Sequence, residues 1–208
     1  MADKASVEFW FDPTCPWCWI TSRWIKEVEK VRDIDVVWNP FSLSVLNEGR
    51  DLPEKYREHM EQVWGPARVV TAVAENYSQK EIDALYTALG EQIHHQQNHG
   101  GTRYEEAIVA ALAVVGLPEE YAQYAHQDEY DEQMRSSTRR GLEQAGGDDI
   151  GVPLMSINGV TFFGPVISPA PTGEEAGKLF DAALGLASYP GFFELKRPRT
   201  VGPIFNHQ

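Results

Sequence analysis

The chain has 208 residues, of which 42% are hydrophobic and 11% aromatic, and its formal net charge is −13. This composition is typical of a folded protein with one domain, or with one domain that carries a large insertion, and it excludes a disordered chain. A strongly acidic chain repels phosphate backbones, so we expect no nucleic-acid partner.

The N-terminal sequence and the apolar runs bear on where the protein works. The longest apolar stretch, residues 107–116, is too short to cross a bilayer and predicts a core helix instead. The first residues lead directly into a strand-like segment, which leaves no room for the apolar region of a signal peptide. We therefore expect no membrane association and a cytoplasmic location, where structural disulfides are rare.

The first elements form a β-α-β unit. Residues 7–11 are rich in aromatic and β-branched side chains and predict a short buried strand. Pro16 suits the first position of a helix, which we expect over residues 16–32. Residues 34–38 predict the second strand. The chain then shows helical periodicity almost without strand signals, and it predicts helices over residues 53–76 (kinked or broken at Gly65-Pro66), 78–95, 104–115, 119–126 and 129–145.

Strand signals return near the C-terminus. Residues 154–157 and 160–163 flank Asn158-Gly159, the signature of a hairpin with a type I′ turn. A helix should follow over residues 173–186, and the tail from Ser188 should lack regular structure. Together these patterns predict an α/β protein with a thioredoxin fold and a large all-helical insertion. The expected divisions are a thioredoxin-fold domain, a helical insertion and a C-terminal tail, over residues 1–45 with 150–190, 46–149 and 191–208.

The two cysteines of the chain lie three positions apart, in the motif Cys15-Pro16-Trp17-Cys18 at the predicted strand-to-helix turn. At a helix start, unpaired backbone N–H groups and the helix dipole stabilise a thiolate at Cys15, which is the attacking species in thiol chemistry. Cys18, one turn further in, should be shielded and should resolve a mixed disulfide on Cys15. The motif therefore predicts a redox-active pair.

A structural zinc site and a structural disulfide are the other possible uses of the two cysteines. A structural zinc site needs four ligands, and only His94, His95 and His99 are close enough to one another to complete one. A structural disulfide across two residues would brace almost nothing. We therefore expect no metal and no bound cofactor.

A second element of the site is Gly151-Val152-Pro153, just before the third predicted strand. A proline at the first residue of a strand is often only a structural feature of a sheet edge, with no role in function. In thioredoxin folds, however, a cis-proline at this position faces the cysteine pair. We accordingly expect a cis Val152–Pro153 bond beside Cys15, with the Val152 backbone available to a substrate.

Several other residues are weaker candidates. Trp17 cannot be buried without burying the nucleophile, so it should form an aromatic lip for substrate. Asp12 suits either proton transfer or capping, and Asn47, Tyr56 and His59 suit either a pocket or the surface. The remaining aromatic and histidine side chains read as core or as hydrogen-bonded helix residues: Trp10, Trp19, Trp24, Trp38, His94, His95 and His99.

Three segments of the chain closely resemble the mycothiol-dependent nitroreductase family, which is DsbA-like in fold. They are residues 10–24 around the cysteine motif, residues 158–165 and the aromatic tail at residues 188–197. The resemblance implies that mycothiol, a small sugar-linked thiol, restores the reduced pair. It also implies that the protein reduces nitroaromatic or similar electrophilic compounds, with Cys15 essential. It adds weight to substrate contacts by Trp17, Asn47 and Tyr56.

Rival functions stay open at this point. The nearest is a general protein disulfide oxidoreductase. A small-molecule or metal-binding module and a transferase-like isomerase that only holds a thiol cofactor are more distant. We expect a monomer or a homodimer that meets a small-molecule thiol and an electrophilic substrate.

Overall fold

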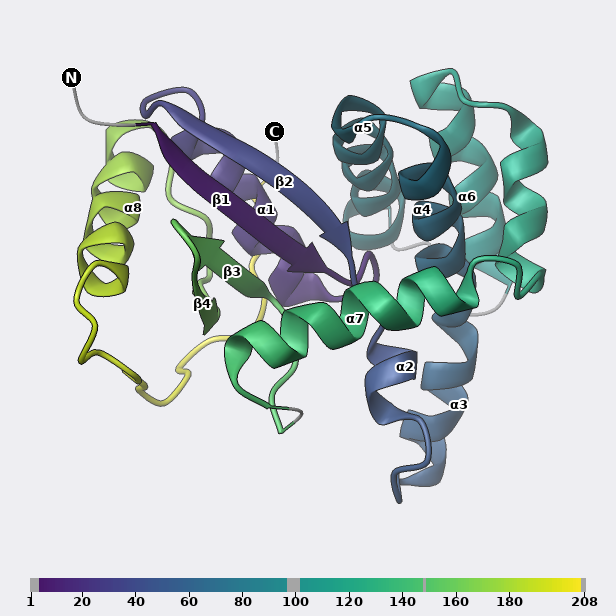
Figure 1. The fold of residues 1–208 in the computed structure, drawn as a ribbon. Helices are drawn as coiled ribbons and strands as arrows, with labels where there is room; N and C mark the ends of the chain where they lie inside the picture. The colour runs from purple at the N-terminus through teal and green to yellow at the C-terminus, as the bar shows by residue number, and fades with distance from the viewer. Residues whose placement is uncertain (1–3, 97–101, 148, 207–208) are drawn as a thin grey trace.

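A computed structural model describes residues 4–96, 102–147 and 149–206 of the chain. Its centre is a four-stranded sheet in the order β2-β1-β3-β4 (Figure 1). The strands are β1 (Ala5–Phe11), β2 (Ile34–Pro40), β3 (Leu154–Ile157) and β4 (Val160–Phe163). β1 pairs parallel with β2 and antiparallel with β3, and β4 pairs antiparallel with β3. This is the predicted thioredoxin fold.

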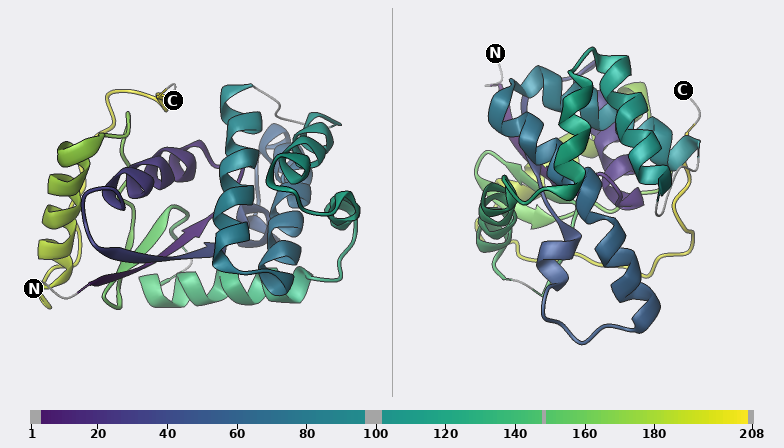
Figure 2. Two further views of the ribbon diagram at one scale, coloured as in Figure 1. Left: turned by 90° about the horizontal axis from the view of Figure 1, so that it is seen from above. Right: turned by 90° about the vertical axis from the view of Figure 1, so that its right-hand side faces the viewer.

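Helices cover both faces of the sheet and one of its ends. The helices α1 (Pro16–Val28) and α8 (Gly173–Ala187) lie on one face, and α7 (Asp131–Ala145) crosses the other (Figure 2). The remaining helical segments gather beyond the carboxyl ends of β1 and β2 (Figure 1). They are α2 (Leu43–Asn47), α3 (Glu54–Gln62), α4 (Trp64–Asn76), α5 (Gln79–Gly90), the π-helical turn η1 (Glu91–His95), α6 (Thr102–Val115) and the 3₁₀ segment η2 (Glu119–His126).

The hairpin prediction is confirmed. Asn158 and Gly159 both have positive φ, at 50° and 85°, as a type I′ turn requires. The Asn158 side chain also accepts a hydrogen bond of 2.9 Å from the Ser6 backbone N–H, which ties the turn to β1.

Two helices differ from the prediction by more than two residues or in where they break. The helix expected over residues 53–76 is broken at Val63, not at Gly65-Pro66. Pro66 lies in the first turn of α4, where its missing N–H has no helical partner to lose. The helix expected over residues 16–32 ends at Val28, and its last residues form turns. Residues 97–101, between the helices expected over residues 78–95 and 104–115, lie outside the described residues.

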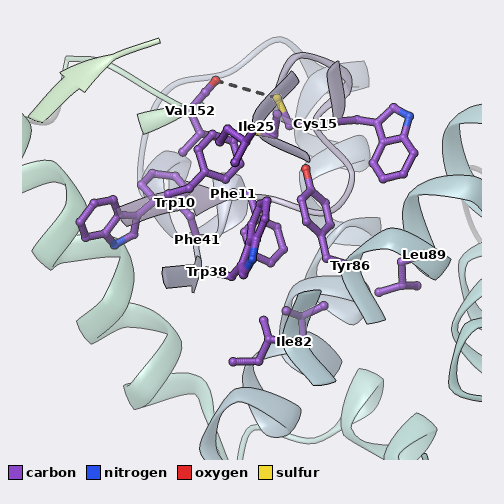
Figure 3. Close-up of a cluster of buried hydrophobic side chains, with 14 of the residues drawn as sticks. Trp10, Phe11, Cys15, Ile25, Trp38, Phe41, Ile82, Tyr86, Leu89 and Val152 are labelled. Atoms are coloured by element: carbon purple, nitrogen blue, oxygen red, sulfur yellow. Dashed lines mark hydrogen bonds between the residues drawn. The ribbon is translucent and has the colours of Figure 1, made fainter. Parts of the chain in front are cut away.

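Aromatic side chains fill much of the core (Figure 3). Alternate residues of β1 point to opposite faces of the sheet, so the aromatic residues of this strand contribute to the packing on both faces. Phe11 stacks on Tyr86 of α5, with ring centroids 3.8 Å apart. Trp10 faces α7 instead, where a Cβ on Gly141 would lie 2.9 Å from the indole. The four tryptophans predicted to be core, Trp10, Trp19, Trp24 and Trp38, are all buried.

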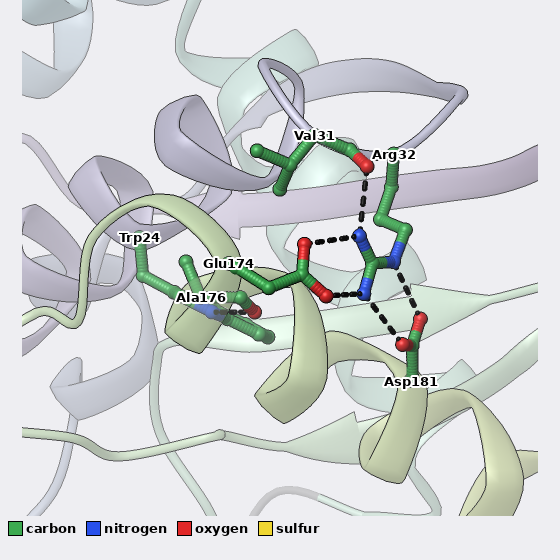
Figure 4. Close-up of polar contacts among 6 residues, drawn as sticks. All are labelled: Trp24, Val31, Arg32, Glu174, Ala176 and Asp181. Atoms are coloured by element: carbon green, nitrogen blue, oxygen red, sulfur yellow. Dashed lines mark hydrogen bonds and ion pairs between the residues drawn. The ribbon is translucent and has the colours of Figure 1, made fainter.

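α8 is fastened to the end of α1 by polar contacts (Figure 4). The Trp24 indole N–H donates to the Ala176 carbonyl oxygen at 3.0 Å. The Arg32 guanidinium bonds the carboxylates of Glu174 and Asp181 at 2.7 to 3.1 Å. Among the described helices, none is both long enough and apolar enough to cross a membrane.

Candidate active site

Cys15 caps the N-terminus of α1, as the sequence predicts. Its backbone is extended, with φ −77° and ψ 115°, and its carbonyl oxygen accepts the Trp19 N–H at 3.1 Å. Its own N–H donates to the Asp12 carbonyl oxygen at 3.0 Å, which closes a tight turn between β1 and α1. Both cysteines are free thiols; Cys15 is 6% exposed and Cys18 is fully buried.

The strand-opening proline lies beside Cys15. The Val152–Pro153 bond is cis, which confirms the prediction. The Cys15 Sγ lies 3.9 Å from the Val152 carbonyl oxygen (Figure 3). Two segments separated by more than a hundred residues therefore meet at this sulfur.

Cys18 keeps its proton at neutral pH. Burial raises the pKa of the Cys18 thiol well above its ordinary value, and a hydrogen bond to Cys15 raises it further. The protonated Cys18 thiol donates this hydrogen bond to the Cys15 sulfur. The geometry assigns different chemistry to the two cysteines.

Asp12 is fully buried and acts as a cap. Its carboxylate accepts hydrogen bonds from the Thr14 N–H and hydroxyl, at 2.8 and 2.7 Å, and from the Leu43 N–H at 2.8 Å. Burial raises the pKa of Asp12, and these hydrogen bonds oppose the shift. Of the two roles considered for this residue, the contacts support capping, which ties the cysteine turn to the start of α2.

Asn47 and Tyr56 approach the cysteine turn from α2 and α3. Burial raises the pKa of the Tyr56 phenol, and the nearby charges of Asp12 and Cys15 add to the shift. The Asn47 amide donates to the Leu43 carbonyl oxygen at 2.8 Å and also bonds Tyr56. The His59 ring centroid is 6.5 Å from that of Tyr56. Tyr56 is 40% exposed, so it can meet a ligand from solvent.

Two of the three histidines singled out from the sequence, His94 and His95, connect η1 to the cysteine turn and to Trp19. The His94 Nε2 donates to the Pro13 carbonyl oxygen at 3.1 Å, and its ring stacks on Trp19. The Trp19 indole N–H donates to the His95 Nε2 at 3.1 Å. His99 lies outside the described residues. Within residues 4–96, 102–147 and 149–206, no three His, Cys, Asp or Glu side chains form a metal-binding group.

Three residues near the cysteines were not anticipated. Tyr86 lies beneath the motif, where burial and the neighbouring Cys18 raise its pKa well above the ordinary value. In the tail, the Arg199 guanidinium lies 4.8 Å from the centroid of the half-buried Trp17 ring. Phe205 packs on the two histidine rings of η1 at 5.5 and 5.7 Å. Nothing in the sequence pattern of an irregular tail indicates which residues return to the site.

Comparison with known proteins agrees with this geometry. A family model described as mycothiol-dependent nitroreductase Rv2466c matches residues 14–197. The chain belongs to this family. It is thus a thiol-dependent oxidoreductase with a DsbA-like thioredoxin fold.

The relatives extend the comparison at lower identity. The uncharacterised protein Rv2286c of Mycobacterium tuberculosis is 29% identical over 200 residues, which are 96% of this chain and 84% of that protein. DsbA of Chlamydia trachomatis is similar in structure, with a TM-score of 0.59 at 10% identity over 91% of each chain. A probable DsbA oxidoreductase of Streptomyces coelicolor has a TM-score of 0.53 at 18% identity over 94% of each chain. These structures share the fold with this nitroreductase-family member.

Proposed function

We propose that this protein is a mycothiol-linked oxidoreductase that reduces small electrophilic or nitroaromatic compounds through Cys15 and Cys18. One observation carries the proposal. Cys15 caps α1 with its sulfur 3.9 Å from the Val152 carbonyl oxygen, and a buried, protonated Cys18 bonds it from within. A thiol at a helix N-terminus with a second thiol beside it to resolve the mixed disulfide is the arrangement that thiol-disulfide exchange requires.

The reaction on a disulfide substrate follows from these roles. The Cys15 thiolate attacks one sulfur, forms a mixed disulfide and releases the first substrate thiolate, which takes a proton from water. The Cys18 thiol then loses its proton, attacks the Cys15 sulfur and releases the second thiolate. With a nitro compound, the same two electrons and two protons yield a nitroso compound and water. In either case the pair ends as a disulfide.

Mycothiol restores the dithiol in two exchanges. The first molecule attacks the Cys15 sulfur, forms a mixed disulfide and releases Cys18, which takes up the proton. The second attacks that mixed disulfide and leaves mycothiol disulfide and the Cys15 thiol. The family supports mycothiol as the partner. We also propose a cytoplasmic location, which membership of a mycothiol-dependent family supports.

Five further residues are proposed to form the substrate site. The Val152 carbonyl group, presented by Pro153, bonds a ligand that lies along the cysteine turn. Trp17 offers the face of its ring, and Asn47 and Tyr56 offer polar groups from the insertion. Because Cys15 is only 6% exposed, the site favours a small molecule over a folded protein.

Two variants and two assays test the function. Cys15→Ser should abolish reduction of both a nitroaromatic compound and mycothiol disulfide. Cys18→Ala should retain the first attack and accumulate a mixed disulfide on Cys15, visible by mass spectrometry as the added mass of mycothiol. Full activity of Cys15→Ser refutes the proposal. Rapid reduction of insulin at the same Cys15 would instead favour a general protein disulfide oxidoreductase.

A further inference from the structure

The C-terminal tail places a cation at the entrance to the cysteine motif. The Arg199 guanidinium lies 4.8 Å from the centre of the Trp17 ring, a distance typical of a cation–π contact. Trp17 is half-buried and separates the two cysteines in sequence. A molecule that lies on this indole therefore meets the guanidinium as well.

The position of Arg199 is fixed by contacts on the tail that follows it. The Ser168 hydroxyl donates to the Gly202 carbonyl oxygen and accepts the Ile204 N–H, both at 2.8 Å. The Asn206 amide donates to the Ala170 carbonyl oxygen at 2.7 Å. The loop that carries Ser168 and Ala170 is itself tied to α1, because the Thr21 hydroxyl donates to the carbonyl oxygen of Pro165 at 2.8 Å. These bonds relate the tail to the helix that bears the cysteines.

The charge of Arg199 is available to a ligand. Among the described residues, no carboxylate forms an ion pair with its guanidinium, which is solvent-exposed. A guanidinium stacked on an aromatic ring keeps its N–H edge free to donate to a planar, electron-rich oxygen pair. The chain as a whole has a net charge of −13, so a cation here counters the general repulsion of anions.

We infer that Arg199 is a specificity-determining residue, which selects oxidants that carry a carboxylate beside the bond to be reduced. The inference rests on the proposed function, because it assumes that Cys15 attacks the substrate. The N–H edge of the guanidinium binds the oxygen pair, and the Trp17 ring supports the aromatic part of the same molecule. The oxidant is thereby held with its reducible group toward the cysteines.

Two chromogenic disulfides distinguish an effect on the binding of an anionic oxidant from an effect on the general reactivity of the cysteines. The disulfide of thionitrobenzoate is anionic and carries a carboxylate on each ring, whereas dithiodipyridine is neutral. Each oxidises the reduced protein with the same balance: one protein dithiol and one aromatic disulfide give one protein disulfide and two aromatic thiols. The second-order rate constant of each reaction is measured by stopped flow at low and high salt.

Arg199→Ala should slow the anionic probe about tenfold and change the neutral probe less than about twofold. Arg199→Lys should give an intermediate loss, because it keeps the charge without the planar donor edge. Arg197→Ala is the matched control, since it removes an equal charge from an exposed position on the same segment. It should change the anionic rate less than about twofold.

The outcomes are distinct. An equal change with both probes in Arg199→Ala means that the residue only holds the tail in place, and it overturns the inference. If the Arg197 and Arg199 variants slow the anionic probe equally, the selectivity comes from the overall electrostatic potential of the tail, and this result also overturns the inference. If Cys15→Ser reacts with the neutral probe as fast as the wild-type protein, the proposed function itself is wrong, whatever the ratio of rates.

Discussion

Gly90, the last residue of α5, allows the Trp19 indole to pack directly on the helix backbone. A Cβ built at Gly90 would lie 2.1 Å from both Cε3 and Cζ3 of Trp19, and 2.6 Å from its Cη2. Ordinary carbon contacts lie at about 3.5–4.0 Å, so the overlap exceeds an ångström. Gly90→Ala therefore requires the indole or α5 to move.

The indole has little freedom to move. It is 1% exposed, and its N–H is bonded to His95. The Arg23 guanidinium carbon lies 4.1 Å from its ring centroid, and Tyr86 packs edge-on at 5.9 Å. A shift of the ring must disturb these partners or the helix α1 that carries it.

The expected magnitude follows from two opposing effects. In a helix interior, Ala is about 1 kcal/mol more favourable than Gly. Overpacking of a filled core costs about 1–3 kcal/mol, and an overlap of this size belongs at the upper end. Gly90→Ala should thus lower the free energy of unfolding by about 2 kcal/mol. Gly185→Ala in α8 is the matched control: nothing lies within 4 Å of its Cβ, so it should gain about 0.5–1 kcal/mol.

Urea unfolding of the two variants checks the opposite signs. The double variant Gly90→Ala with Trp19→Phe lacks the outer ring atoms and should lose less stability than the sum of the single changes. Because Trp19 follows Cys18 directly, Gly90→Ala should also slow the reaction of Cys15 with dithiodipyridine. A Gly90→Ala protein as stable as the wild type would refute the packing argument.

Three further predictions concern pH. Arg32→Met removes the partner that lowers the pKa of the Glu174 and Asp181 carboxyls, so the wild type should melt at a higher temperature than the variant at neutral pH. That advantage should be lost as the pH falls below about 4 and should shrink in high salt, as thermal melts can show. Because the pKa of Cys18 is raised in the folded protein, the contribution of this thiol to stability is present below about pH 9 and is lost as the pH rises further. Above about pH 9, the unfolding free energy of Cys18→Ala should therefore fall less steeply with pH than that of the wild type. Tyr86→Phe should show the same behaviour above about pH 10, because burial raises the pKa of its phenol.

The sheet and the cysteine turn could be predicted because short local patterns determine them. Asn158-Gly159 specifies its hairpin through positive φ at both residues, and Pro16 opens α1 directly after Cys15. The cis bond before Pro153 followed from the fold, not from local sequence. By contrast, the helix break at Val63 has no Gly or Pro at the break itself, so periodicity alone could not locate it.

The surroundings of Cys15 depend on long-range contacts, which no local pattern encodes. Tyr86 faces the cysteines because α5 packs against the sheet through Phe11. Arg199 and Phe205 reach the site through a tail without regular structure, and its path is fixed by hydrogen bonds to a loop more than thirty residues away. The sequence could supply these residues only as unassigned polar and aromatic positions.

The burial of Cys15 is produced by the elements that surround the thioredoxin core. Asn47 and Tyr56 approach from α2 and α3, η1 contacts the cysteine turn through His94, and the tail lies over Trp17. Each brings polar or aromatic groups to the start of α1, where a bare thioredoxin fold would present the thiol to solvent. With 6% exposure, the Cys15 sulfur is less accessible to a disulfide on another folded protein than to a small molecule. In the proposed function, the helical segments beyond the sheet and the tail therefore restrict the exchange to small molecules, and the proposed role of Arg199 is to set which of them react fastest.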